Sequence, residues 1–230
     1  MARIILIETS TALCSTALSE DGVVVASRES SEPRAHASMT APYVGEMLSG
    51  RGLRVSDCDA VCVSMGPGSY TGLRVGSSTA KGLCFGTGLP LLALSSLEIL
   101  VAQALSEGLV PEGCSAIVPM IDARRMEVYT APFSPAGEML GEIAPLIVGE
   151  GSFADLLAAG PVLFIGDGAE KCRPVLRSGN AVFVQTCPRA AAMAAPAQKA
   201  FDDGKFVDTA YFEPFYLKDF VATVSRKKLF

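Results

Sequence analysis

The residues of this sequence that could carry out chemistry are a glycine-rich segment, three carboxylates at the ends of apolar runs and a single histidine. The glycine-rich segment, GPGSYTGLRVG at residues 66–76, joins an expected strand to an expected helix, where backbone N–H groups attract phosphate. A Walker A loop ends in Lys-Ser/Thr, but the nearest lysine, Lys81, precedes Gly82. The fingerprint G-x-G-x-x-G also fails, because the third glycine comes one residue late and no acidic residue follows about twenty positions on. Both nucleotide motifs are therefore excluded.

The three carboxylates are Glu8, Asp122 and Asp167, and each lies at the end of an apolar run that we expect to form a strand. Actin-like ATPases hold the metal and phosphates of ATP from such positions. Here the first carboxylate is Glu in place of Asp, and the glycine that should follow to let phosphate approach is missing. The sequence therefore argues against autonomous ATP turnover. We expect Asp122 to pair with one of the two arginines that follow it, and Asp167 to close a turn and cap the next helix.

His36 is the only histidine, so a His-based triad or a zinc-protease site would need partners that the sequence does not supply. In a helical HxxxH metal pair the second ligand stands four residues on, and that residue here is Thr40. One imidazole does not anchor a metal well. We expect His36 to lie at a helix start, hydrogen-bonded to backbone or solvent, and we expect neither a metal site nor a catalytic residue.

Two stripes of residues on consecutive expected helices could form a contact surface. In the helix expected over residues 71–85, small side chains recur every four positions and share one face: Gly72, Gly76, Ala80 and Cys84. This face could meet another subunit closely or pack on the chain's own sheet, and the spacing leaves both open. In the helix expected over 39–48, a second stripe is separate from Val44 and Leu48, which suit the core: Met39, Tyr43 and Met47. Met and Tyr are enriched at adaptable interfaces, although a methionine stripe is more often core.

The order of the expected elements predicts an α/β protein of two half-domains with mixed sheets. Strands are expected at 4–7, 15–18, 23–26, 60–65, 91–94, 116–120, 127–133, 143–148 and 162–165, and further helices at 96–105, 153–158, 169–176 and 189–202. Pro42 requires its helix to start just before it, because proline is tolerated in the first turn. The turn Pro111-Glu112-Gly113 divides the chain into half-domains 1–110, which carries both stripes, and 111–230.

Composition restricts the classes of function. A chain of 230 residues can bury a core without disulfides, and its seven cysteines are odd in number and form no CxxC pair, so we expect reduced, structural thiols. The net charge of −5 and the single basic cluster, Arg226-Lys227-Lys228, argue against direct nucleic-acid binding. The N-terminal apolar run is too short for a signal or a membrane span. We therefore expect a cytoplasmic protein that does not contact a membrane.

Four segments, in order, resemble the TsaB (YeaZ) family: ETST at 8–11, SMGPGSYTGLRVG at 64–76, DARRMEVY at 122–129 and GDGAE at 166–170. They cover most of the chain, and the residues after Glu170 match weakly. The resemblance implies an actin-like ASKHA (ribonuclease H-like) fold. It also implies a role beside the catalytic paralogue TsaD, with TsaE and TsaC, in modifying adenosine 37 of tRNAs that read ANN codons. TsaD carries an HxxxH pair where this sequence has His36 and Thr40.

The family's partner surface is formed largely by its two early helices. The resemblance thus implies an interface at Met39, Tyr43, Met47, Gly72, Arg74, Gly76 and Ala80. It implies a scaffold without its own active site that pairs with TsaD, binds TsaE, forms a homodimer when alone and reaches tRNA only through the complex. We expect no cofactor to bind stably to the isolated chain, with ATP or ADP held at the interface with TsaD. Two alternatives stay open: a metallopeptidase-like glycoprotease homologue, and an ASKHA kinase of a small molecule.

Overall fold

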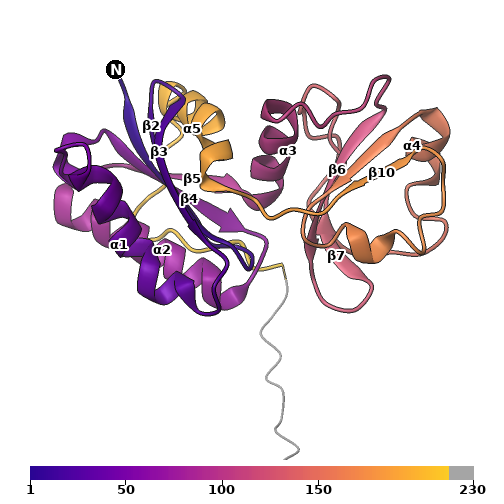
Figure 1. Ribbon diagram of the computed structural model, residues 1–230, viewed down its shortest axis with the longest axis horizontal. Coiled ribbons are helices and arrows are strands. Elements are labelled where there is room, and N and C mark those ends of the chain that lie inside the picture. The colour runs from indigo at the N-terminus through magenta and orange to yellow at the C-terminus, as the bar shows by residue number, and fades with distance from the viewer. Residues whose placement is uncertain (218–230) are drawn as a thin grey trace, which may run out of the picture.

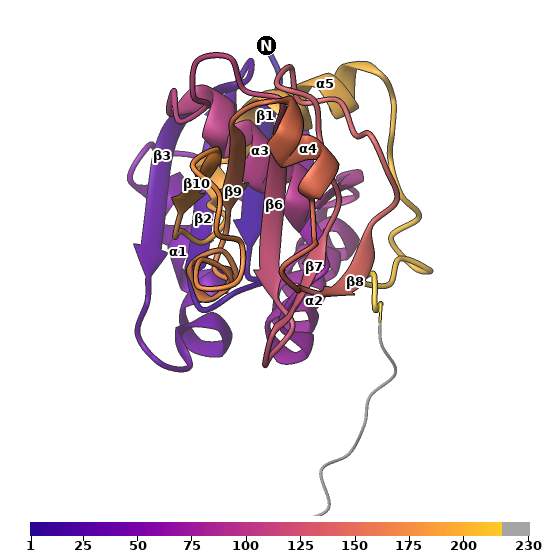
Figure 2. The ribbon, with the colours of Figure 1, turned by 90° about the vertical axis from the view of Figure 1, so that its right-hand side faces the viewer.

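The structure, a computed structural model, describes residues 1–217, which form two lobes built on two five-stranded sheets. Figure 1 shows the lobes side by side, with the N-terminus in the first lobe. Figure 2, turned by 90°, places the second lobe in front, with β6 and β9 adjacent in its sheet. The basic cluster at 226–228 lies outside the described residues.

The first sheet has the strand order β3-β2-β1-β4-β5, in which β1 to β3 are antiparallel and β4 and β5 run parallel to β1. The strands are β1 (Arg3–Glu8), β2 (Cys14–Glu20), β3 (Val23–Ser30), β4 (Ala60–Gly66) and β5 (Leu91–Ser95). The central strand β1 is apolar on both faces because both are covered. Ile4 and Leu6 pack into one core cluster, and Ile5 and Ile7 into another on the opposite side.

Helices α1 (Ala35–Ser49) and α2 (Tyr70–Thr87) cover one face of this sheet; between them the chain forms a 3₁₀ turn, η1 (Val55–Asp57), and then strand β4. Ser69 caps α2 by accepting from the Gly72 amide, and Gly88, with φ of 77°, ends it in the left-handed conformation that favours glycine. Helix α1 begins four residues earlier than expected, so Pro42 lies in its interior. The helix tolerates the lost hydrogen bond because Thr40, Val44 and Leu48 are buried and hold it in place.

The second sheet has the order β10-β9-β6-β7-β8. Its elements are β6 (Ala116–Asp122), β7 (Glu127–Thr130), β8 (Ala144–Ile147), α4 (Ala154–Ala159), β9 (Val162–Ile165), the 3₁₀ turn η2 (Glu170–Cys172) and β10 (Ala181–Val184). The helix expected at 169–176 is thus only a short turn, and β10 was not predicted. Helix α3 (Ser96–Ser106) lies between the lobes: Ile99 packs in a core cluster of the first sheet, whereas Leu97 and Leu100 pack on the second.

The two sheets lie on either side of the predicted boundary near residue 111, with β1 to β5 before it and β6 to β10 after it, but the prediction that all of 111–230 belongs to the second half-domain is wrong. The chain returns to the first sheet through η3 (Ala190–Met193) and α5 (Ala194–Asp202), whose alanines pack on Ile4, Leu6 and other residues of that core. After α5, Val207 forms a bridge to Leu91 at the edge of β5, and Phe212 is buried on the α1/α2 side. A run of small apolar residues fits closely against a sheet that is already formed, and the sequence pattern alone does not say which sheet.

The small-residue face of α2 points into the protein, which corrects the expectation that Gly72, Gly76 and Ala80 meet another subunit. A methyl group on Gly72 would collide with the backbone oxygen of Thr9, and one on Gly76 with the Thr9 hydroxyl. Met47 is also core, only 2% exposed, and lies beside the Thr16 hydroxyl. On these helices Arg74 is still exposed, and Met39 and Tyr43 are partly exposed.

Two further features bear on the sequence analysis. All seven cysteines are unpaired, and five of them are buried. None of the helices between residues 1 and 217 combines the length and the apolar character that a membrane span requires.

The packing of α2 makes a prediction about stability. Gly76→Ala should lower the free energy of unfolding by about 1–3 kcal/mol, because the new methyl group overpacks the contact with Thr9. Gly82→Ala is the matched control: it lies on the same helix with open space where a Cβ would be, and should raise stability by about 0.5–1 kcal/mol. Urea unfolding followed by circular dichroism measures both. Equal responses of the two variants would show that the Gly76 face is not an internal contact.

Candidate functional site

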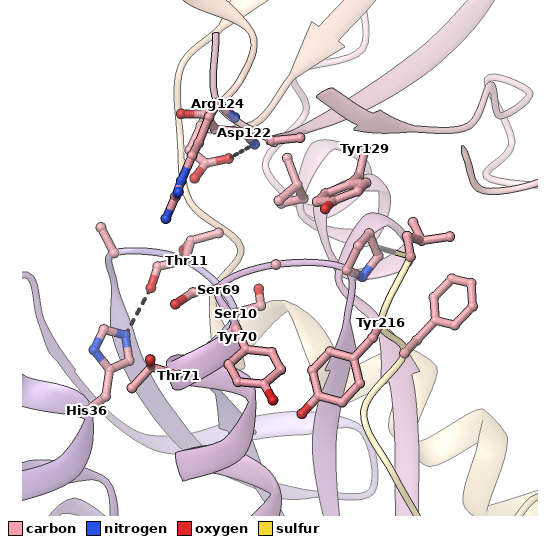
Figure 3. A pocket seen from close by; sticks show the side chains of 18 residues that line it. Ser10, Thr11, His36, Ser69, Tyr70, Thr71, Asp122, Arg124, Tyr129 and Tyr216 are labelled. Carbon is pink, nitrogen blue, oxygen red and sulfur yellow. Dashed lines mark hydrogen bonds between the residues drawn. The ribbon is translucent and has the colours of Figure 1, made fainter. Parts of the chain in front are cut away.

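A cleft of about 770 Å³ lies between the lobes and is the main candidate for a functional site. Six segments line it: the β1–β2 turn, the start of α1, the N-terminus of α2, the β6–β7 turn with the strand residues beside it, the turn after β9 and the end of the described C-terminal segment. In Figure 3, Asp122 and Arg124 lie on one side of the cleft, and His36, Ser69 and Tyr70 on the other. The cleft thus joins the ends of strands from both sheets, as in other α/β proteins that bind ligands.

The end of the cleft at α2 is filled by the chain itself. Ser69 donates its backbone N–H to the Ser10 carbonyl oxygen over 2.6 Å, and the Gly72 amide donates to the Ser69 hydroxyl over 3.3 Å. The Thr9 hydroxyl in turn donates to the Gly72 carbonyl oxygen over 2.8 Å. Two backbone amides that a phosphate could use at this helix N-terminus, those of Ser69 and Gly72, are therefore already engaged.

Glu8 lies beneath this turn and is completely buried. One carboxylate oxygen accepts a hydrogen bond from the Ser10 amide, whereas Oε2 has no well-formed hydrogen bond within residues 1–217. Burial raises the pKa of Glu8 to about 7, against the lowering effect of its Ser10 and Ser64 hydrogen bonds. A carboxyl group that is partly protonated at neutral pH is a weak ligand for a cation unless a further positive charge nearby favours its ionised form.

Asp122 and Asp167 are brought together on the opposite side of the cleft, and each expected role is correct only in part. The Asp122 carboxylate forms its ion pair with Lys171, whereas the following Arg124 contacts it through its backbone amide over 2.8 Å; the lysine ammonium also donates to the Glu127 carbonyl oxygen over 2.7 Å. Asp167 lies in a turn closed by the Ala169 amide and the Gly166 carbonyl oxygen, as expected, but it accepts from the Asp122 amide over 2.9 Å and does not cap a helix. The pKa of Asp167 is raised to about 6, mainly by burial. Both expectations considered only residues that are close in the sequence, whereas Lys171 is far from Asp122 in the sequence.

His36 is the second residue of α1, as expected, and its Nε2 lies 2.9 Å from the Thr11 carbonyl oxygen (Figure 3). The Thr40 hydroxyl donates to the His36 carbonyl oxygen over 2.6 Å. In the part of the chain that the structure describes, no three His, Cys, Asp or Glu side chains are grouped so that they could hold a metal ion. His36 thus links α1 to the β1–β2 turn.

Three residues at this site were not predicted from the sequence. The rings of Tyr70 and Tyr216 pack against each other at a tilt of 45°, with centroids 5.0 Å apart, although the residues are far apart in the sequence. Arg124 lies in the β6–β7 turn with φ of 71°, which is strained for a residue other than glycine and holds it at the edge of the cleft. The motif DARRMEVY could have indicated Arg124, whereas nothing in the weakly patterned C-terminal segment indicated Tyr216.

Comparison with known proteins identifies the family. The sequence matches the family described as TsaD, tRNA N6-adenosine threonylcarbamoyltransferase, over residues 24–226. It is 33% identical over 234 residues to the tRNA threonylcarbamoyladenosine biosynthesis protein TsaB of Escherichia coli K12, covering 96% of each chain. The chain belongs to the TsaB family.

Solved structures agree with this assignment. YeaZ from Pseudomonas aeruginosa superimposes with a TM-score of 0.82 at 30% identity, over 94% of this chain and 100% of that one. The activator of 2-hydroxyisocaproyl-CoA dehydratase from Clostridium difficile reaches 0.50 at 10% identity, over 88% and 96% of the two chains, and therefore shares only the fold. The predicted actin-like ASKHA fold is confirmed.

The buried carboxyl of Glu8 predicts a pH dependence of stability. Its pKa is about 7 in the folded protein and 4.5 when exposed, so the folded state binds the proton more tightly. Stability from this residue is therefore complete below about pH 4.5 and is lost as the pH rises through 7, by about 3 kcal/mol in all. Glu8→Gln should be more stable than the parent at pH 8 and nearly equal to it at pH 4.

Thermal and urea unfolding between pH 4 and pH 8 measure this difference. Glu142→Gln, which removes an exposed carboxylate, is the control and should keep the parental slope. A Glu8→Gln protein that loses stability equally at both pH values would show that Glu8 is needed as an anion.

Proposed function

We propose that this protein is a non-catalytic subunit that acts with TsaD, and with TsaE and TsaC, in the threonylcarbamoylation of adenosine 37 in tRNAs reading ANN codons. The observation that carries the proposal is the relationship, over nearly its whole length, to a protein named for threonylcarbamoyladenosine biosynthesis. The acidic chain, with a net charge of −5, reaches tRNA through the complex and not by a basic surface of its own.

The contacts in the cleft support the proposal that this chain has no active site of its own. The nitrogen of His36 that faces the cleft is engaged by the Thr11 backbone, and Thr40 stands at the position of a second metal ligand. The turn after β1 packs against the N-terminus of α2, where an ATPase would hold phosphate, and accepts a hydrogen bond from the Ser69 amide there. These contacts argue against both the metallopeptidase and the kinase alternatives.

The partner surface in this proposal is the exposed side of α1 and α2. A shallow groove of about 490 Å³ lies between them and is lined by Ala37, Tyr70, Thr71, Arg74, Val75, Ser78 and Thr79. Met39 and Tyr43 are partly exposed on α1, and Phe85, 91% exposed, lies near the end of α2. A related fold such as TsaD can present a matching helix pair, and so can a second copy of this chain. The homodimer and the heterodimer therefore compete for one surface.

This surface predicts a specific loss of function. Arg74→Glu reverses an exposed charge in the groove and should weaken association with TsaD by at least tenfold. Arg177→Glu, an exposed arginine on the second lobe, is the control and should bind as the parent does. Sedimentation measures binding, and a tRNA modification assay with each protein omitted in turn measures function. Modification that proceeds fully without this chain would refute the proposed function.

Nucleotide belongs to the complex in this proposal, with ATP or ADP held where the chain meets TsaD. Calorimetric titration of ADP should show no saturable binding to the isolated chain. Two amides at the phosphate end of the cleft already donate hydrogen bonds to oxygen atoms of the chain itself. The same titration into the complex should saturate. Micromolar binding of ADP to the chain alone would contradict this assignment.

A further inference from the structure

The end of the described C-terminal segment, residues 207–217, crosses the flank of α2; we call this segment the strap. It begins at the bridge between Val207 and Leu91. The Lys81 ammonium then donates to the carbonyl oxygens of Ala210 and Phe212, over 3.0 and 3.1 Å. The Phe215 amide donates to the Met65 carbonyl oxygen over 2.7 Å. The strap therefore runs antiparallel to α2, from the middle of the helix to its N-terminus.

At the end of the strap, Tyr216 joins two residues of α2. Its ring centroid lies 5.0 Å from that of Tyr70, the first residue of the helix. The Arg74 guanidinium lies 4.1 Å from the centre of the Tyr70 ring, and its interaction with the Tyr216 hydroxyl group raises the pKa of Arg74. Figure 3 shows Tyr70 and Tyr216 side by side with their hydroxyl groups pointing the same way. We call these three residues the tyrosine–arginine cluster.

The cluster lies between the two hollows of the molecule. Tyr70 and Thr71 line both the cleft and the groove on α1 and α2, Arg74 lines the groove, and Tyr216 lines the cleft. Tyr216 remains 38% exposed. The strap thus adds an accessible aromatic side chain beside the groove, and Tyr and Arg are the residue types that most often dominate binding energy at protein interfaces.

The cluster also restricts the mobility of Arg74. An exposed arginine on a helix samples many rotamers, and ordering it costs entropy when a partner binds. Here the guanidinium contacts a ring face and interacts with a hydroxyl group, and both contacts favour this position over other rotamers before any partner arrives. Held in this way, Arg74 keeps donors that can reach a partner's carboxylate or carbonyl oxygens at lower entropic cost.

We propose that the strap is a third part of the TsaD-binding surface, and that Tyr216 positions Tyr70 and Arg74 for contact with that partner. The inference rests on the proposed function and extends its interface from two early helices to a segment near the end of the chain. Tyr216 acts both by presenting its ring beside the groove and by fixing the arginine.

The test measures the affinity of the full-length chain for TsaD by calorimetry. Tyr216→Ala removes the ring and the hydroxyl and should weaken binding about tenfold or more. Tyr216→Phe keeps the ring but loses the bond to Arg74, and should weaken binding by an intermediate factor of about three. Tyr211→Ala is the matched control, since Tyr211 lies on the same strap, is 85% exposed and is absent from both hollows. It should bind as the parent does.

A purely structural role is separated by two further measurements on the free variants. Thermal unfolding should be unchanged in Tyr216→Phe, and the exchange rate of the Phe215 amide should stay as in the parent, so a loss of affinity there reports on Arg74 and not on the strap's attachment. If Tyr216→Ala binds as tightly as the parent while Arg74→Glu does not, the strap proposal is wrong and the proposed function stands. If the parent itself does not bind TsaD, both are wrong.

Discussion

The close contact between the β1–β2 turn and the first turns of α2 is the constraint on which the first lobe depends. Gly68, Gly72 and Gly76 each lie where a Cβ would collide with Thr9 or Ser10. This approach lets Ser69 donate to the Ser10 carbonyl oxygen and Thr9 to that of Gly72. The same turn covers Glu8, and its Thr11 carbonyl oxygen is in hydrogen-bond contact with His36 on α1. One narrow helix face thus sets the position of the strand end, the carboxyl group and the neighbouring helix.

The same contact explains why a segment that looks like a phosphate-binding loop need not bind phosphate. Glycines after a strand serve wherever a backbone or a ligand must come close to a helix. In this protein the approaching backbone is that of the β1–β2 turn. The glycine pattern therefore indicates that something lies close to the helix, and the structure is needed to show whether it is a ligand or another part of the chain.

Local patterns were sufficient for much of the fold. Apolar runs indicated β1, β4, β6 and β9, and the helix expected over 71–85 agrees with α2 to within two residues at each end. The order of elements also predicted two half-domains, and the two sheets lie on either side of residue 111. Two errors arose where a long-range contact decides. The alanines of α5 pack on the first sheet, which their composition could not reveal, and β10 is short and only half-buried.

The candidate site was harder to predict because its residues come from six separate segments. Glu8, Asp122 and Asp167 were found from their positions after strands, but their partners were not, since Lys171 and Asp167 reach Asp122 from a distant part of the chain. The helix stripes illustrate a second limit. A period of four shows which residues share a face and not whether that face is buried, so Gly76 and Met47 were assigned to a surface that they do not reach.

What remains exposed on α2 is therefore determined by what the other faces do. Its glycine face is committed to the β1–β2 turn, and one flank is covered by the strap through Lys81. The side that carries Arg74, Val75 and Ser78 lines the groove and remains accessible. Since the strap ends beside that side, the C-terminal segment both closes the core of the first lobe and forms the edge of its open surface. Because three sides of α2 make such contacts, few of its residues can be changed without altering either the fold or the surface.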